Sequence, residues 1–579
     1  MAIVSRVPSR ARIGDILVAQ QRITPQQLER ALVEQKRTGR KLGRTLVGLG
    51  YVDENTLLTA LSKQLDIPFI ELKQFRFDGE LVKRLPETLA RRFRVMLLRE
   101  DPDGVLLGMA DPTDILSHDE LLRIVKKPLK PVVVRESELL EILDIAYNRA
   151  EEIASLAEQL DEQLQDSAVD LGDIVIDATD TDAPVVRLLQ KIFEESINTK
   201  ASDIHIEPDE NVLRIRQRID GVLNEQVMHE KRIAAALVVR LKLMSGLNIS
   251  EKRLPQDGRF NLKVKNRNID VRISTMPVQF GESVVMRLLD HTEGVLPLTK
   301  VGMPALLVKR FRFLTSRPHG LMLVTGPTGS GKTTTLYGAL SELNTADKKI
   351  ITVEDPVEYR LPRISQVQVH EKIGLSFAAV LRAALRQDPD ILLVGEIRDK
   401  DSAEIALRAA MTGHMVLSTL HTNDAVTSAL RLVDMGVDPY LVASSLKAVI
   451  AQRLVRRVCL SCSEPYHPDS NEERLLIQHR LSDPEAALKL RKGAGCPHCF
   501  NTGYRGRIGV FELLEINRAM AEALRDNSVR DFNHAAVDCS GYRPLNAAAL
   551  EYALNGVTTL EEVLRVSALV EDESLVSTS

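Results

Sequence analysis

Short apolar runs separated by helix-prone segments characterise the chain beyond residue 320. The runs lie at residues 321–324, 350–353, 391–394 and 415–420. Continuous apolar runs of this length are typical of strands buried on both faces of a parallel sheet. We therefore predict an open α/β sheet. The carboxyl ends of its strands should share the edge at which such sheets bind their ligands.

The first 65 residues repeat one apolar and polar pattern with a period of 29 residues. Each unit predicts a short apolar helix, a turn and a second helix that begins after an N-cap residue, Thr24 or Asp53. Packing of two helical hairpins explains the leucines. It does not require the paired basic residues and glutamines, which suit the phosphates of a ligand with two similar halves. The matched residues are Arg12, Gly14, Leu17, Leu28, Leu32 and Gln35 in the first unit and Lys41, Gly43, Leu46, Leu57, Leu61 and Gln64 in the second.

The length of 579 residues predicts three or four domains at about 150 residues each. Residues 1–150 hold the repeat and a small α/β unit with strands predicted at 93–98, 105–109 and 131–134. Residues 151–182 carry eleven acidic and no basic residues, which predicts a linker whose first part, to 164, is helical. Residues 183–295 predict an α+β domain with helices at 185–196 and 233–244. Residues 296–579 hold the predicted sheet, a cysteine-rich module at 455–512 and helices at 513–570, and we expect 571–579 to be disordered.

A glycine-rich loop connects the first predicted strand of the sheet to a helix predicted at 334–343. Its glycines allow backbone N–H groups to face a phosphate chain, Lys332 is suited to the β and γ phosphates, and Thr333 to Mg²⁺. A glycine turn that binds nothing would require both the pattern and its flanks to be accidental. The residues of this predicted ATP site are Gly326, Pro327, Thr328, Gly329, Ser330, Gly331, Lys332, Thr333 and Thr334.

Polar side chains follow the other predicted strands. The acidic segment 354–358 is a candidate for the group that orients or deprotonates an attacking water. Gly395 stands where an ordinary P-loop ATPase has its metal-binding aspartate, so we assign Mg²⁺ to Glu396. His414 and His421 bracket the strand at 415–420, and we predict that they sense the γ-phosphate, although a lone histidine is more often structural.

Basic residues are dense between 183 and 289, and most of them should lie on a solvated sheet face. An oligomeric P-loop enzyme nevertheless needs cations that neutralise charge developing on the γ-phosphoryl group. Arg259, Arg272 and Arg287 are reasonable suppliers.

Composition narrows the class of protein. The chain has 76 basic and 80 acidic residues, a net charge of −4, no Trp and 4% aromatic residues, which disfavours a nucleic-acid partner. The basic N-terminus lacks the apolar segment of a signal peptide, and no run of 18 apolar residues occurs, so we expect a cytoplasmic protein.

The cysteines form two pairs with metal-ligand spacing. Four thiolates complete a tetrahedral zinc site, whereas a redox role would require a thioredoxin-like unit that is absent here. Cys539 stands alone and is expected to be inert. The predicted ligands are Cys459, Cys462, Cys496 and Cys499.

The motifs together resemble a known family. A P-loop at 326–333, an acidic segment at 352–359, an atypical Walker B strand at 390–399 and a histidine segment at 412–424 occur in the order of the secretion ATPase superfamily. The N-terminal units look like the 24-residue repeats of the cyclic-di-GMP-binding domain of certain pilus and secretion ATPases. With the cysteine module, which in this family marks assembly rather than retraction motors, the chain resembles the GspE/PilB assembly ATPases of type II secretion and type IV pili, such as the mannose-sensitive haemagglutinin type.

The resemblance implies a fold and an activity. The fold is a multidomain α/β P-loop (RecA-like) ATPase that forms a hexamer with active sites between subunits. Glu358 would be the catalytic base, Glu396 would lie near Mg²⁺, and arginines of the preceding domain would close on the phosphates. The two repeats would each hold half of cyclic-di-GMP, with Ile13 replacing the usual leucine, and with Lys41 replacing an arginine and so lacking its planar stacking face. An inner-membrane platform protein and a cytoplasmic adaptor are the implied partners.

Two other functions remain open at this point. A P-loop hexamer could instead be a nucleic-acid motor, which an ATPase activity unaffected by DNA would exclude. The chain could also be chiefly a second-messenger receptor that gates assembly with little turnover of its own.

Overall fold

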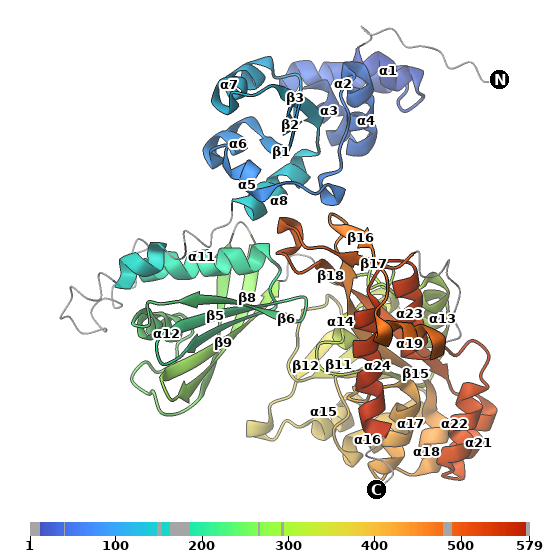
Figure 1. The fold of residues 1–579 in the computed structure, drawn as a ribbon. Helices are drawn as coiled ribbons and strands as arrows, with labels where there is room; N and C mark the ends of the chain where they lie inside the picture. The colour runs from blue at the N-terminus through green and yellow to red at the C-terminus, as the bar shows by residue number, and fades with distance from the viewer. Residues whose placement is uncertain are drawn as a thin grey trace.

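The computed structural model describes residues 12–39, 41–147, 153, 155–161, 184–264, 267–290, 294–478 and 489–574. Most of the predicted linker and the last five residues of the predicted disordered tail lie outside them. Figure 1 shows an N-terminal part, a second part built on a large antiparallel sheet, and a larger C-terminal part.

The N-terminal repeat forms two equivalent pairs of helices. The first pair is α1 (Ile13–Ala19) and α2 (Pro25–Thr38), and the second is α3 (Leu42–Gly48) and α4 (Glu54–Leu65). Both predicted caps are confirmed, because the side chain of Thr24 accepts from Gln27 N–H and that of Asp53 from Thr56 N–H. Leu17 and Leu46, which occupy equivalent positions, are fully buried in the shared core.

A small α/β module follows, with its own apolar core. The strands β1 (Val95–Asp101), β2 (Gly104–Met109) and β3 (Leu129–Val133) lie in this order, β2 antiparallel to β1 and parallel to β3. The three predicted strands are thus confirmed. Around them lie η1 (Leu72–Gln74), α5 (Gly79–Lys83), α6 (Glu87–Phe93), α7 (Ile115–Val125) and α8 (Glu136–Ala146).

The second part is an antiparallel sheet with order β6-β5-β4-β9-β8-β7, and the apolar faces of α11 (Pro184–Asn198) and α12 (Ile233–Met244) belong to its core. Residues 155–161 are helical, as predicted for the first part of the linker, but Leu156 and Leu160 are buried in this same core, so this helix belongs to the second part rather than to a linker. The strands are β4 (Asp203–Pro208), β5 (Leu213–Ile219), β6 (Val222–Met228), β7 (Gln256–Val264), β8 (Arg267–Val278) and β9 (Gly281–Asp290).

The C-terminal part contains the predicted α/β sheet, with order β12-β11-β13-β14-β10-β15-β18. All four apolar runs are strands, and they pair in parallel, with Gly320 opposite Met415 and Ile350 opposite Ile391. The strands are β10 (Gly320–Thr325), β11 (Ile350–Glu354), β12 (Ser365–Gln368), β13 (Ile391–Val394), β14 (Met415–Leu420), β15 (Leu446–Val458) and β18 (Tyr504–Glu515). The helices are α13 (Ala305–Thr315), α14 (Lys332–Leu343), α15 (Phe377–Ala384), α16 (Lys400–Met411), α17 (Ala425–Asp434) and α18 (Pro439–Ser445), with a short η2 (Glu371–Ile373).

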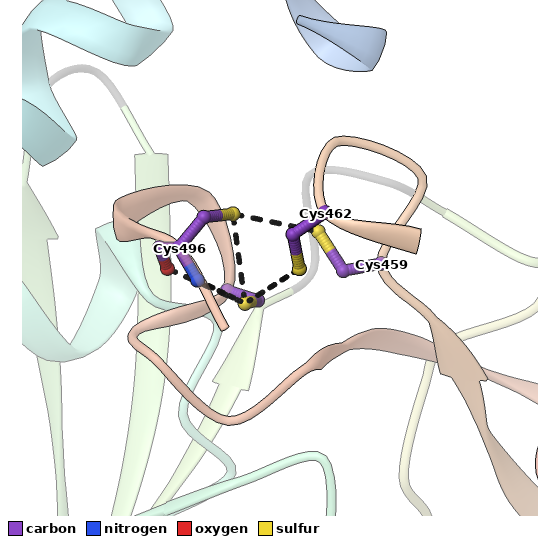
Figure 2. Close-up of side chains that lie close together, drawn as sticks. Cys459, Cys462 and Cys496 are labelled. Atoms are coloured by element: carbon purple, nitrogen blue, oxygen red, sulfur yellow. Dashed lines mark hydrogen bonds between the residues drawn. The ribbon is translucent and has the colours of Figure 1, made fainter. Parts of the chain in front are cut away.

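The cysteine module lies where β15 leaves the sheet and β18 returns to it. It consists of β16 (Ser463–Pro465), α19 (Ser470–Gln478), β17 (Arg491–Gly493) and η3 (Pro497–Cys499). Figure 2 shows the two cysteine loops facing each other.

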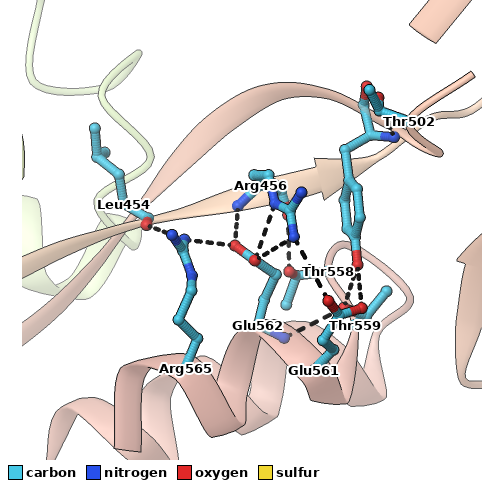
Figure 3. Close-up of polar contacts among 9 residues, drawn as sticks. Leu454, Arg456, Thr502, Thr558, Thr559, Glu561, Glu562 and Arg565 are labelled. Atoms are coloured by element: carbon cyan, nitrogen blue, oxygen red, sulfur yellow. Dashed lines mark hydrogen bonds and ion pairs between the residues drawn. The ribbon is translucent and has the colours of Figure 1, made fainter. Parts of the chain in front are cut away.

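The chain ends in α21 (Arg518–Arg525), α22 (Val529–Val537), α23 (Leu545–Leu554) and α24 (Leu560–Ser574). The helices therefore begin at 518 rather than 513, since β18 continues to Glu515 in antiparallel pairing with β15. The last helix also extends past 571, where we expected disorder. The fully buried carboxylate of Glu562 anchors α24 by accepting from Arg456 and Arg565 (Figure 3). Among the described helices, none combines the length and apolar character needed to cross a membrane.

Candidate active site

The P-loop closes around its own lysine. Positive φ angles at Gly326, Gly329 and Gly331 bend the chain between β10 and α14. At Gly326 a Cβ atom would lie 2.5 Å from the carbonyl oxygen of Gln452, so only glycine fits there. The Nζ of Lys332 donates to the carbonyl oxygens of Gly326 (2.6 Å) and Pro327 (3.1 Å). Burial lowers the pKa of Lys332 to about 8.

A cleft of about 930 Å³ lies against this loop, at the carboxyl edge of the sheet. It brings together the predicted P-loop residues 327–334, Glu358 of the acidic segment, Glu396 and His421. Arginines come from two other places: Arg218 and Arg287 from the second part, and Arg453, Arg507 and Arg565 from the C-terminal strands and α24. A polyanion entering this cleft would meet lysine, arginine and helix N-terminus together.

Glu358 is held by a cation from another part of the chain. Its Oε2 lies 2.7 Å from Nη2 of Arg272, which β8 provides. Both side chains are about 30% exposed; Glu358 lines the cleft, whereas Arg272 lines an adjoining hollow over β7 and β8. Glu354, at the end of β11, is instead buried and accepts from Tyr337, Thr352 and Gln366.

Glu396 and His421 lie side by side. Glu396 follows β13 and accepts from Nε2 of His421 at 3.1 Å, and it forms an ion pair with Arg398. Arg398 also lies 3.5 Å from Asp355. The cluster therefore links the carboxyl ends of β11, β13 and β14 through ion pairs and a hydrogen bond.

The structure does not bring His414 to the cleft. His414 precedes β14 whereas His421 follows it, so the six-residue strand separates them by roughly 20 Å. The Nδ1 of His414 lies 3.0 Å from the carbonyl oxygen of Ala409 at the end of α16. The prediction that His414 and His421 act together at the γ-phosphate is therefore wrong for His414, because the two ends of a strand lie on opposite edges of the sheet.

The three candidate arginines occupy different places. Arg272 pairs with Glu358, and Arg287 donates to Asp203 (3.1 Å) while lining the cleft. Arg259 and Arg272 both line the adjoining hollow over β7 and β8, and of the three candidates Arg287 lines the cleft itself. Sequence reasoning missed Arg453, whose Nη2 donates to Asn423 at 2.7 Å, because only the pairing of β15 with β10 brings it to the cleft.

The N-terminal repeat places equivalent residues in equivalent contacts. A Cβ atom at Gly14 would lie 2.6 Å from Leu28 Cδ1, and one at Gly43 would lie 2.9 Å from Leu57 Cδ2. The glycines therefore serve close helix packing. Packing does not explain exposed Arg12 before α1, nor its equivalent Lys41, which pairs with Asp111 and donates to Thr113 (3.2 Å).

The four predicted metal ligands form a compact, buried cluster. The Sγ atoms of Cys459 and Cys496 are 3.8 Å apart, as are those of Cys462 and Cys499, and Cys496 and Cys499 are 3.7 Å apart (Figure 2). A tetrahedron of zinc–sulfur bonds of about 2.3 Å has edges of about 3.8 Å. The sulfurs thus fit Zn²⁺, and His498 is not among the ligands, because its Nε2 lies 3.2 Å from the carbonyl oxygen of Leu72.

Comparison with known proteins identifies the family. The family model described as "Type II/IV secretion system protein" matches residues 178–565, which is more than half of the chain. The chain belongs to this family. As one of its members it is an ATPase. A second model, the MshEN domain, matches residues 65–153, which hold the three-stranded module rather than the repeat.

Curated relatives span nearly the same length. The type IV pilus assembly ATPase PilB of Myxococcus xanthus is 41% identical over 96% of this chain and 98% of its own. The type II secretion system ATPase E of Vibrio cholerae is 42% identical over 85% of this chain and 98% of its own. Among solved structures, that of MshE with cdg is 38% identical over 23% of this chain and 98% of its own, with a TM-score of 0.23.

Proposed function

We propose that this ATPase is a cytoplasmic assembly motor, a hexamer that drives addition of subunits to a type IV pilus or a type II secretion pseudopilus. The observation that carries the proposal is the cleft in which the P-loop, Glu358 and Glu396 meet arginines from a separate domain. Because the arginines and the P-loop belong to separate domains, hydrolysis can be coupled to domain movement. The cysteine module, which the resemblance associates with assembly motors, supports assembly of the fibre rather than its retraction.

The side chains then have separate roles in hydrolysis. Lys332 and the P-loop N–H groups hold the phosphates, and Thr333 and Glu396 would hold Mg²⁺, which neutralises charge on the phosphates. Glu358 orients the attacking water and accepts its proton, once Arg272 turns from the carboxylate toward the γ-phosphoryl group. His421 holds Glu396 in place and senses the γ-phosphate.

Turnover of the purified full chain tests the motor. We expect Mg²⁺-dependent ATPase activity that DNA does not alter, a particle of six chains, and a loss of roughly 10²–10⁴-fold in kcat for Glu358→Gln. Deletion of the gene should abolish a surface fibre or the secretion of proteins, and the fibre or cargo lost would identify the machine. Stimulation by DNA would favour the nucleic-acid motor, and turnover only in the presence of a second messenger would favour the receptor.

We further propose that cyclic-di-GMP regulates this motor through its N-terminal residues. Support comes from the duplicated Arg12 and Lys41 positions and from the MshEN match beside them. Calorimetry on the full chain should detect binding that Arg12→Ala and Gln64→Ala both abolish, because each changes one half of the site. Binding that survives both variants would place the ligand elsewhere, and no binding at micromolar ligand would reduce the repeat to a docking scaffold.

The proposed motor would act at the inner membrane together with two partner proteins. An inner-membrane platform protein would receive the movement, and a cytoplasmic adaptor would hold the motor at the membrane. Zn²⁺ at the four cysteines would be structural, since four thiolates close the site to other ligands.

A further inference from the structure

One tyrosine connects the P-loop helix to both ends of the acidic segment. Tyr337 lies on α14, five positions after Lys332, and is 1% exposed. Its hydroxyl is hydrogen-bonded to the carboxylate of Glu354 and lies 3.4 Å from the backbone nitrogen of Glu358. The ring packs edge to face on Tyr359, with centroids 6.0 Å apart.

The chemistry of a phenol fixes the direction of both bonds. A tyrosine hydroxyl has one proton to donate and lone pairs that accept. It donates to Glu354, which has no proton of its own when ionised, and it accepts from the N–H of Glu358. Burial, and then the neighbouring carboxylate, raise the pKa of Tyr337, so the hydroxyl remains a donor at physiological pH.

Glu354 is the anchor of this arrangement. It is 4% exposed, and besides Tyr337 it accepts from the Thr352 hydroxyl and the Gln366 amide. A buried carboxylate must keep its donors, because leaving it unpaired is costly. Thr352 and Gln366 lie on strands β11 and β12. Of these three donors, Tyr337 is the one that belongs to the P-loop helix, and it connects that helix to the carboxylate of Glu354.

We propose that Tyr337 is a positioning residue for hydrolysis, which holds the segment from Glu354 to Glu358 at a fixed distance from the P-loop helix. Lys332 begins that helix, and Glu358 carries the carboxylate that faces the cleft. The hydroxyl therefore sets where the base lies relative to the phosphates. This inference rests on the proposed role of Glu358.

Tyr337→Phe separates positioning from packing, because phenylalanine keeps the ring and removes only the hydroxyl. We expect kcat for ATP to fall roughly 10- to 100-fold, as for other small misplacements of a reacting group, while KM and the Kd for ADP stay within about twofold. A residue that merely fills the core would leave kcat unchanged. Unchanged kcat in a folded Tyr337→Phe variant therefore overturns the inference.

Tyr542→Phe is a matched control. The Tyr542 hydroxyl donates to the buried carboxylate of Glu512 at 2.9 Å, and neither residue lines the cleft. The control should lower thermal stability and leave kcat intact. An equal loss of kcat in both variants would show that loss of any buried tyrosine bond lowers turnover, and would overturn the specific role of Tyr337.

The double variant distinguishes this inference from the role of Glu358. If Tyr337 acts through Glu358, adding Tyr337→Phe to Glu358→Gln should lower kcat no further. A further fall equal to that of Tyr337→Phe alone would mean that the two residues act independently, against the inference. Full activity of Glu358→Gln alone would instead remove Glu358 as base, and the inference would fail with it for that separate reason.

Discussion

The guanidinium of Arg272 lies 2.7 Å from the carboxylate of Glu358, although β8 and the segment after β11 belong to different domains. The pair joins the antiparallel sheet to the nucleotide cleft. It also occupies the carboxylate that we propose as the base. If Glu358 is the base that we propose, turnover requires the pair to separate.

Arg272→Ala frees the carboxylate of Glu358, but we expect it to lower the rate of hydrolysis rather than raise it. In the proposed mechanism Arg272 also neutralises the negative charge that develops on the γ-phosphoryl group, and arginines in such a role contribute roughly 10³–10⁵-fold to kcat. We expect kcat to fall by at least about 100-fold. Arg272→Lys should recover little, because an ammonium lacks the planar fork. Arg259→Ala is the control, because it changes the cation that lies opposite Arg272 on β7 and leaves the Arg272–Glu358 ion pair in place. An Arg272→Ala variant as active as this control would reduce the ion pair to a domain contact.

The site could be predicted from the sequence where its parts follow strands. Glu358, Glu396 and His421 all follow buried apolar runs, and the parallel pairing of β11, β13 and β14 makes those ends adjacent. The prediction for His414 was wrong because this residue precedes its strand and so lies at the opposite edge of the sheet. Arg272 was found only as one of several cations, since sequence patterns do not show which arginine faces which carboxylate.

Contacts between distant segments could not be predicted at all. His498 and Leu72 are 426 residues apart, and no periodicity relates them. Residues 155–161 were assigned to a linker from their charge, but their apolar positions pack on the second domain. Composition describes a segment's average character, whereas burial depends on one face of a helix.

Removal of one cysteine ligand should release the metal. We expect Cys496→Ser to contain no zinc and to unfold roughly 5–10 °C lower, because a closed thiolate site contributes its binding energy to folding. Cys539→Ser is the matched control, since Cys539 is a half-buried free thiol outside the cluster. Metal analysis and calorimetric melting measure both. One zinc per chain in Cys496→Ser would show that the cluster is not the metal site.

The depressed pKa of Lys332 predicts proton uptake on nucleotide binding. With a pKa of about 8, much of the lysine is neutral in the free protein at pH 8–9, and phosphates beside it restore the charged form. ATP binding should therefore take up a fraction of a proton at pH 8.5 and less at pH 7, where the lysine is already charged. Calorimetry in two buffers of different ionisation enthalpy measures this number. Lys332→Arg, where it still binds, should take up none, and equal uptake by both proteins would assign the proton to another group.

The N-terminal module and the cysteine module form a direct contact that can be tested by exchanging charges. The Nη2 of Arg505 lies 2.7 Å from Oε1 of Glu141 on α8, and Arg505 also hydrogen-bonds His498, whose ring reaches Leu72. Lys73 also lies 3.7 Å from Glu141, on the side of the N-terminal module. Because Arg505 and Glu141 carry opposite charges, Arg505→Glu and Glu141→Arg should each separate the modules through like-charge repulsion, and the double variant should restore the contact between residues 141 and 505.

Hydrogen exchange measures this separation in the full chain. We expect faster exchange in residues 72–74 and 497–499 in either single variant, and exchange near that of the wild type in the double variant. Arg518→Glu, which breaks the exposed pair of Arg518 and Glu522 on α21, is the control and should leave both segments unchanged. If exchange is the same in the wild type, both single variants and the double variant, the modules separate freely in solution and the pair does not hold them together.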